Sequence, residues 1–182
     1  MSENLPHRAA AATPMQAVAW EGELPERIAG AFAGAGLRCL SYLGQQFIEA
    51  PQSGVRLLIQ FLRDREQFDM LTDLTALDHP KDAGRFEIVY CLYSFPRNQR
   101  IRVKTRVAEG EDAPSIVSIF TGANWLEREV YDMFGVRFAG HPDMKRILLP
   151  EEWRGFPLRK DKSILAMDQD WVRDHLHIES GQ

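Results

Sequence analysis

The chain has 182 residues, of which 45% are hydrophobic and 26% are charged. This composition suits one packed globular domain and excludes a collagen, a coiled coil and a wholly disordered chain. The 22 Lys and Arg residues against 26 Asp and Glu give a net charge of −4, which argues against bulk binding of nucleic acid. Cys39 and Cys91 form no CxxC pair, so the sequence predicts no zinc site, iron–sulfur cluster or redox dithiol of its own.

The charges divide the chain into three parts. Residues 1–96 hold 8 basic and 12 acidic side chains, residues 97–162 hold 13 and 10, and residues 163–182 hold 1 and 4. The middle part is therefore cationic between two acidic flanks. The sequence contains neither a run of about 18 apolar residues nor a signal-type apolar core near its start. We therefore expect a protein of the cytosolic side with reduced thiols.

The first part of the chain mixes turn residues with short apolar runs. Residues 1–22 are rich in Ala, Pro and small polar residues without a sustained period, which is typical of a flexible leader. Beyond them, apolar spacing and turn residues predict a helix, three neighbouring antiparallel strands and a short amphipathic helix. These elements are expected at residues 24–36, 37–43, 46–50, 55–62 and 65–74, in that order.

A long hairpin is predicted next, with arms at residues 85–95 and 99–107 joined by Pro96-Arg97-Asn98. In the second arm cations alternate with apolar residues, so a strand here buries one face and lines up four charges on the other. This row is either a solvated face that protects an edge or a docking surface for an acidic partner. Nucleic acid fits less well, because no aromatic residue lies among the cations. The four cations are Arg100, Arg102, Lys104 and Arg106.

A helix is predicted to begin at Asn124, because Glu127 lies three residues later in a capping-box arrangement. Gly135 supplies its C-terminal stop. On a helical wheel Arg128 and Asp132 pair on the face opposite the apolar stripe.

Glu129 falls at the margin of that stripe, where a carboxylate needs a cation, and we expect Arg146 first and Arg159 second. An acid–base pair of Glu127 and Glu129 is the weaker interpretation, because no nucleophile, metal cluster or oxyanion-hole signature accompanies it.

The segment after Gly135 loses clean periodicity. His141 lies in a Gly-His-Pro turn and is expected to order that turn by hydrogen bonds, rather than to relay protons or bind a metal. The following residues are rich in Arg and Trp, which concentrate binding energy at protein interfaces. We therefore expect this arm to dock on a partner through Trp153, Arg159 and Lys160, with an arm laid over the chain's own sheet as the alternative.

Three motifs, ERExxYDMFG, GHPDxKRIL and GFPLRKD, together resemble the 30 kDa subunit, also called the C subunit, of respiratory complex I, the proton-pumping NADH:quinone oxidoreductase. The resemblance is strongest over residues 124–161 and covers about two thirds of the chain. The chain departs from the family pattern at Cys91, where the family often has His, and in the residues after the RKD motif. The signature and structural positions are Glu127, Arg128, Glu129, Asp132, Phe134, Gly135, His141, Lys145 and Arg146.

The resemblance implies an α+β domain over residues 23–135, with helices packed on a mixed, mostly antiparallel sheet. Residues 136–182 then form an irregular C-terminal arm and tail that dock on partner subunits. It also implies a cofactor-free subunit, without catalytic or metal-binding residues, in the peripheral arm on the cytoplasmic side of the bacterial inner membrane. FMN, iron–sulfur clusters and quinone are then held by neighbouring subunits. This subunit lies beside those that hold the last cluster and frame the quinone site, and it supports electron transfer from NADH to quinone coupled to proton translocation.

Two other functions are compatible with the same residues. One is the equivalent subunit of a membrane-bound NiFe hydrogenase or of a quinone dehydrogenase with another electron donor. The other is a standalone module that binds an acidic protein through the cationic strand.

Overall fold

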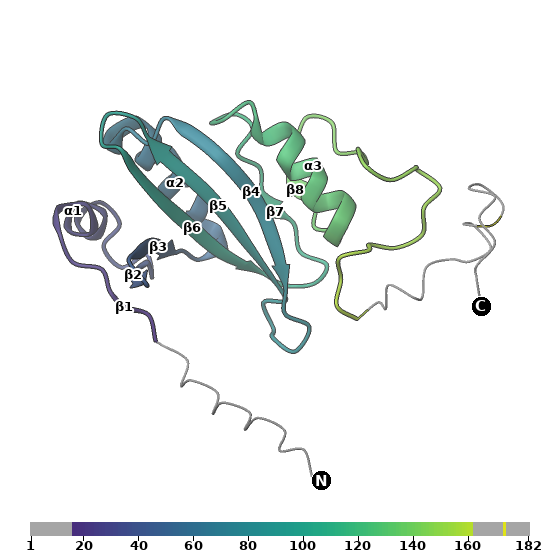
Figure 1. Cartoon of the computed structure of the whole chain (residues 1–182), viewed down its shortest axis with the longest axis horizontal. Helices are drawn as coiled ribbons and strands as arrows, with labels where there is room; N and C mark the ends of the chain where they lie inside the picture. The colour runs from purple at the N-terminus through teal and green to yellow at the C-terminus, as the bar shows by residue number, and fades with distance from the viewer. Residues whose placement is uncertain (1–15, 162–172, 174–182) are drawn as a thin grey trace, which may run out of the picture.

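The computed structural model describes residues 16–161 and Arg173, and the expectations for the first 15 residues and for the rest of the tail lie outside that part. The described chain forms an α+β fold in which a six-stranded sheet packs against helices, as the sequence predicts (Figure 1). Its elements are β1 (Val18–Ala19), α1 (Glu23–Ala31), β2 (Arg38–Tyr42), β3 (Gln45–Glu49), α2 (Gln52–Glu66), β4 (Met70–Asp78), β5 (Phe86–Ser94), β6 (Gln99–Val107), β7 (Ala113–Pro114), α3 (Ala123–Phe134) and β8 (Phe138–Ala139).

The large sheet has the strand order β1-β2-β3-β6-β5-β4. Every neighbouring pair is antiparallel except β3 and β6, which run parallel with Glu49 opposite Lys104. The mixed, mostly antiparallel sheet is therefore confirmed. The predicted hairpin is confirmed as well, because β5 and β6 pair along their whole length, from Phe86 opposite Val107 to Ser94 opposite Gln99.

The predicted strand at residues 55–62 is wrong, because these residues lie inside helix α2. Val55, Leu58, Ile59 and Leu62 are all fully buried, at the spacing of one helix face. The preceding Pro51-Gln52-Ser53-Gly54 is the start of the helix instead of a turn. A short apolar run looks alike in a buried strand and in a buried helix face, which explains the error.

The predicted helix at residues 65–74 is wrong too. Helix α2 ends at Glu66, Gln67 adopts the left-handed conformation, and strand β4 begins at Met70. The three-residue spacing of Leu71 and Leu74 arises because the pairing of β4 with β5 shifts register between Leu71 and Asp73. A bulge of this kind puts an extra residue between two inward-facing side chains and so mimics a helical period.

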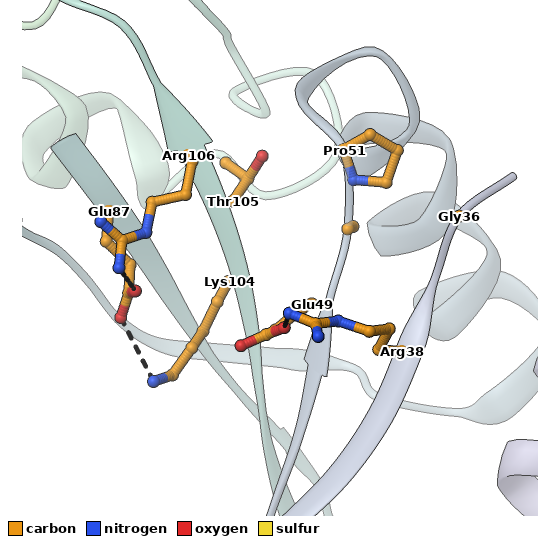
Figure 2. A pocket seen from close by; sticks show the side chains of 9 residues that line it. Gly36, Arg38, Glu49, Pro51, Glu87, Lys104, Thr105 and Arg106 are labelled. Atoms are coloured by element: carbon orange, nitrogen blue, oxygen red, sulfur yellow. Dashed lines mark hydrogen bonds and ion pairs between the residues drawn. The ribbon is translucent and has the colours of Figure 1, made fainter. Parts of the chain in front are cut away.

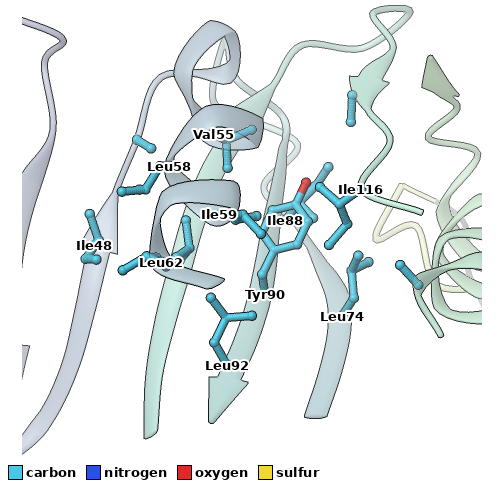
Figure 3. Packing of buried hydrophobic residues seen from close by; sticks show 14 of the residues in the cluster. Ile48, Val55, Leu58, Ile59, Leu62, Leu74, Ile88, Tyr90, Leu92 and Ile116 are labelled. Atoms are coloured by element: carbon cyan, nitrogen blue, oxygen red, sulfur yellow. The ribbon is translucent and has the colours of Figure 1, made fainter. Parts of the chain in front are cut away.

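The hydrophobic core lies between the sheet and its helices (Figure 3). Helix α2 packs on β6, and its buried apolar face shares one core with Ile48 of β3 and with Ile88, Tyr90 and Leu92 of β5. Helix α3 packs beside β4 and closes the core next to Leu74. Strands β4 and β6 bury every second side chain on this face, from Leu74 in β4 and from Ile101 in β6.

The opposite face of the sheet, here called the open face, carries the other set of side chains. On β4, Asp73, Thr75 and Leu77 are exposed, whereas Leu74 and Ala76 between them are buried. The four cations of β6 lie on the open face, because Ile101, Val103, Thr105 and Val107 point into the core. The alternation inferred from the sequence thus separates core from cation row.

Both ends of the expected domain carry short strands. Strand β1 pairs with β2, and the Trp20 N–H donates to the Cys39 carbonyl at 3.0 Å, so the described end of the segment predicted as a leader, residues 16–22, contributes a strand to the sheet. Strand β8 pairs in parallel with β7 at the start of the arm. The arm then passes around α3 and ends beside the loop between β4 and β5 (Figure 1).

Candidate functional site

Helix α3 buries three charged side chains. Glu127 and Asp132 are fully buried and Arg128 is 7% exposed. Moving a charge out of water is costly unless a partner compensates it. The partners of these side chains therefore indicate what the helix is built to hold.

Asp132 holds the arm by its backbone. One carboxylate oxygen, Oδ2, accepts the N–H groups of Ile147, Leu148 and Leu149 at 3.1, 2.8 and 3.0 Å. The other, Oδ1, accepts Nη1 of Arg146 at 2.7 Å. Burial alone raises the pKa of Asp132, but these four donors together lower it below its ordinary value, so the group is a carboxylate. We call these residues the Asp132 cluster.

Two arginines extend the Asp132 cluster through carbonyl groups. Arg128 donates to the carbonyls of Lys145 and Arg146 at 3.0 and 3.2 Å. Arg146 donates to the carbonyls of Trp153 and Gly155 at 3.2 and 3.1 Å. Because both arginines bind main-chain oxygens, they fix the path of the arm between residues 145 and 155.

A second cluster holds the end of the arm. Asp78, which is buried, accepts two hydrogen bonds from Arg85 at 2.8 and 3.0 Å and one from the Lys160 N–H at 2.7 Å. Arg85 also pairs with Glu109 at 2.8 Å and with Asp161 at 2.9 Å. The hydrogen bonds from Arg85 lower the pKa of Asp78 against the effect of burial. We call these residues the Asp78 cluster.

Arg159 lies between the two clusters. Its Nε donates to the Phe134 carbonyl at 2.6 Å, and its guanidinium lies 4.7 Å from the ring centre of Phe156 and 5.1 Å from that of Phe86. Gly135 makes room for this packing, because a Cβ there would lie 2.4 Å from the Phe156 ring and 2.7 Å from Nη2 of Arg159. Its φ of 76° ends the helix, as the sequence predicts.

Glu127 is a buried carboxyl group of α3 that pairs with no cation among the described residues. Its Oε1 accepts the Ile116 N–H at 2.7 Å, whereas Oε2 has no hydrogen-bond partner in the described part of the chain. Burial raises the pKa of Glu127 to about 7, although hydrogen bonds from Ile116 and Ser115 oppose the shift. The Tyr90 hydroxyl, equally buried and without a described partner, points toward the segment of Ile116 (Figure 3).

The predicted capping box is wrong. The helix begins at Ala123, its N-cap residue is Gly122, and no side chain caps it. Glu127 turns inward to Ile116 instead of reaching back to Asn124. The predicted Arg128–Asp132 pair on the outer face is wrong as well, because both side chains are buried under the arm, which a helical wheel does not include.

The predicted partner of Glu129 is also wrong. Glu129 is exposed, Arg146 pairs with Asp132, and Arg159 pairs with Glu109 at 2.8 Å. The arm supplies the expected cations, but it presents them to the neighbouring carboxylates.

His141 orders its turn, as expected. Its Nδ1 accepts the Asp143 N–H at 3.0 Å, and its Nε2 lies 3.1 Å from the Asn124 carbonyl. Lys145 pairs with Asp143 at 2.8 Å on the surface.

The cations of β6 differ in their surroundings. Arg100 is exposed, and Arg102 contacts the side chain of Gln45. Lys104 lies 3.2 Å from Glu87 and 4.7 Å from the ring centre of Phe47. Arg106 pairs with Glu87 at 2.9 Å and with Asp82 at 3.1 Å. The row is therefore partly neutralised within the chain.

Sequence reasoning missed the Asp78 cluster. Asp78 and Arg85 flank the loop between β4 and β5, but Glu109 and Lys160 lie 24 and 82 residues from their respective partners. Nothing local in the sequence connects them. Over residues 16–161 and at Arg173, His, Cys, Asp and Glu side chains form no group suited to a metal ion. The helices of that same part are too short or too polar to cross a membrane.

Comparison with known proteins assigns the family. Residues 48–167, about two thirds of the chain, match the family described as respiratory-chain NADH dehydrogenase, 30 kDa subunit. The C subunit of NADH-quinone oxidoreductase from Rhodobacter capsulatus is 48% identical over 120 residues, which are 65% of this chain and 60% of that protein. The C/D subunit of the same enzyme from Bdellovibrio bacteriovorus is 40% identical over 138 residues, which are 76% of this chain.

A solved structure shares the fold. It is the structure of the membrane-bound sulfane sulfur reductase, an archaeal respiratory membrane complex, one chain of which matches with a TM-score of 0.70 and 25% identity. The match covers 87% of this chain and 92% of that one. This chain spans only 25% of the Bdellovibrio relative. The family match includes α3 and both arm-holding clusters, and the chain therefore belongs to the family of the 30 kDa subunit of respiratory-chain NADH dehydrogenase.

Proposed function

We propose that the chain is a structural subunit of the peripheral arm of a membrane-bound NADH:quinone oxidoreductase, on the cytoplasmic side. In this role it holds no redox group and supports electron transfer from NADH to quinone by shaping and joining its neighbours. FMN, iron–sulfur clusters and quinone belong to those neighbours. They include the subunits that flank the last cluster and the quinone site.

The observation that supports this proposal is the set of hydrogen bonds that the signature residues make to the arm. Asp132, Arg128 and Arg146 direct their hydrogen bonds to main-chain groups of the arm. Buried charge used in this way stabilises one conformation of a segment that has little regular structure of its own. We infer that the arm is kept in shape for docking, with Trp153 and Lys160 among the residues near the contact. The cation row on β6 is a second docking surface in this proposal.

The family assignment favours this enzyme over its alternatives. Both relatives named above are subunits of NADH-quinone oxidoreductase, whereas the fold alone is shared with a sulfane sulfur reductase complex. An equivalent subunit of a NiFe hydrogenase or of another quinone dehydrogenase therefore ranks second. A standalone module ranks third.

Co-purification separates the three. The full-length chain, tagged in its own host, is isolated from solubilised membranes, and its companions are identified by mass spectrometry. We expect flavin-binding, iron–sulfur and membrane-spanning subunits together with NADH:quinone activity. A hydrogenase large subunit among the companions supports the second candidate, and a chain that emerges alone refutes the proposal.

A further inference from the structure

The cations of the row on β6 differ in whether the chain itself neutralises them. Arg106 pairs with Glu87 at 2.9 Å and with Asp82 at 3.1 Å. Lys104 lies 3.2 Å from Glu87, and Figure 2 shows both cations turned toward that carboxylate. Two further charged side chains at this end of the row form an ion pair of their own, Arg38 with Glu49. The end of the row at Lys104 and Arg106 is therefore matched by carboxylates of the same chain.

Arg100 and Arg102, at the other end of the row, have no such partner. In the part of the chain that the structure describes, neither guanidinium forms an ion pair, and Arg102 contacts the neutral side chain of Gln45. Asp69 and Asp73, at and just before the start of β4, are separated from β6 by the whole width of β5. Two strand spacings make about 10 Å, roughly the screening length at physiological salt. Both arginines thus keep donors that an incoming group can use.

Apolar and aromatic side chains surround these two arginines on the open face. In register across the sheet, Arg100 faces Tyr93, which in turn faces Met70. Arg102 borders two hollows of about 240 and 200 Å³, of which the first is also lined by Arg100 and the second by Tyr42. Met70 and Tyr42 are 42% and 41% exposed. Arg, Tyr and Met are enriched at protein interfaces, so these five residues, here called the arginine patch, have the composition of a contact surface.

We propose that the arginine patch binds a segment of a neighbouring subunit through an Asp or Glu side chain, which Arg100 and Arg102 hold by charge-assisted hydrogen bonds. The inference rests on the proposed function, because it requires a neighbour in a complex. It confines the contact to the end of the row where no carboxylate of the described chain competes. A carboxylate fits the planar fork of guanidinium donors. A polyanion fits less well, because the net charge of −4 repels it.

The first test compares two cations of the same strand in the purified complex. Arg102→Gln removes a cation without an ion pair, and its matched control, Lys104→Gln, removes one that is paired with Glu87. We expect the Arg102 variant to be released at lower salt than the parent. Its attachment should be weaker by about tenfold or more, since hydrogen bonds to charged groups contribute that much. The Lys104 variant should be released together with the parent.

Photocrosslinking identifies the group that the patch binds. The photoreactive residue p-benzoylphenylalanine replaces Tyr42, which keeps an aromatic ring in the patch and leaves both arginines intact. We expect irradiation of the purified complex to join this residue to a peptide of another subunit that contains an Asp or Glu. Exchanging the two charges, by Arg102→Glu together with an arginine in place of that acid, should then restore the salt resistance that either change alone removes.

The outcomes separate this inference from the function on which it rests. A complete complex from which the Arg102 and Lys104 variants are released alike overturns the inference and leaves the proposed function intact. Capture of a peptide without an acidic residue, of a lipid or of a nucleic acid also overturns it, as does a charge exchange that restores nothing. A chain that purifies without partners overturns both.

Discussion

Burial moves the titration of the Glu127 carboxyl to near neutral pH, because its pKa is raised to about 7. The pKa of its carboxyl rises from an ordinary 4.5 to about 7, and the groups that act on it are the Ile116 N–H and the Ser115 hydroxyl, with the Tyr90 hydroxyl nearby. Between these two pH values the folded chain binds a proton that the unfolded chain has lost. The free energy of unfolding therefore falls as pH rises from about 4.5 to about 7.

We predict that this decrease amounts to as much as about 3 kcal/mol, since one pKa unit corresponds to about 1.4 kcal/mol. Glu127→Gln keeps the shape of the side chain but has no proton to lose, so its unfolding free energy lacks this part of the pH dependence. Urea unfolding of both proteins at pH 5 and pH 8 measures the difference. Identical pH dependence in the two proteins contradicts a protonated Glu127.

Asp132→Asn is predicted to lower the free energy of unfolding by about 3 to 5 kcal/mol, because Arg146 then remains buried without its anion. Protease should also cut the arm near residues 147–149 faster than in the parent chain. The matched control is Glu129→Gln on the exposed side of the same helix, which should stay within about 0.5 kcal/mol of the parent. Equal effects of the two substitutions contradict the arm-holding role of Asp132.

The sequence predicts which side chains of α3 and the arm are important but not which groups they bind. The motif pointed to Asp132, Arg128 and Arg146, and each of them takes part in holding the arm. The wheel placed Arg128 and Asp132 toward solvent because it contains only the residues of the helix. Once the arm covers that side of α3, the outer face becomes an interior one, and Glu129 remains exposed.

Gly135 joins the end of α3 to the start of the arm. Gly135→Ala is predicted to lower the free energy of unfolding by about 2 kcal/mol or more, because a side chain is strained at φ 76° and its Cβ collides with Phe156. Gly140→Ala is the matched control, since Gly140 has a φ of 85° and open space around it. The control should show only the cost of the left-handed backbone, about 1 to 2 kcal/mol. Chemical denaturation of both variants gives the contribution of the packing, and equal losses count against the collision.

Helices and strands were predictable from the sequence where a single local pattern determines the element. The hairpin of β5 and β6 follows from strict alternation and a turn signal, and Gly135 ends its helix as a glycine should. Helix α2 and strand β4 were interchanged, because an all-buried helix face resembles a strand and a register shift resembles a helical period. Both errors arise from tertiary packing, which a local pattern does not encode.

The two clusters hold one arm, so we predict that they act together across the molecule. Asp78→Asn and Asp132→Asn each remove one attachment of the arm. If the arm detaches as a unit, the first substitution already loses part of the stabilisation that the second attachment provides. The double variant should therefore lose less unfolding free energy than the sum of the single losses, by about 0.5 kcal/mol or more. Urea unfolding of the four proteins measures this coupling. Simple additivity indicates that the two attachments are independent.

The way in which Asp132 binds the arm affects which sequences the arm can have. Its carboxylate accepts hydrogen bonds from three consecutive main-chain N–H groups at residues 147–149. These hydrogen bonds do not depend on which side chains the three residues carry. Proline is the exception, because it has no N–H to donate. The side chain of Leu148, which is 61% exposed, can therefore be exchanged for that of any residue but proline while the arm keeps its path. The arm is thus anchored by main-chain atoms, and the exposed side chain of Leu148 takes no part in that anchorage.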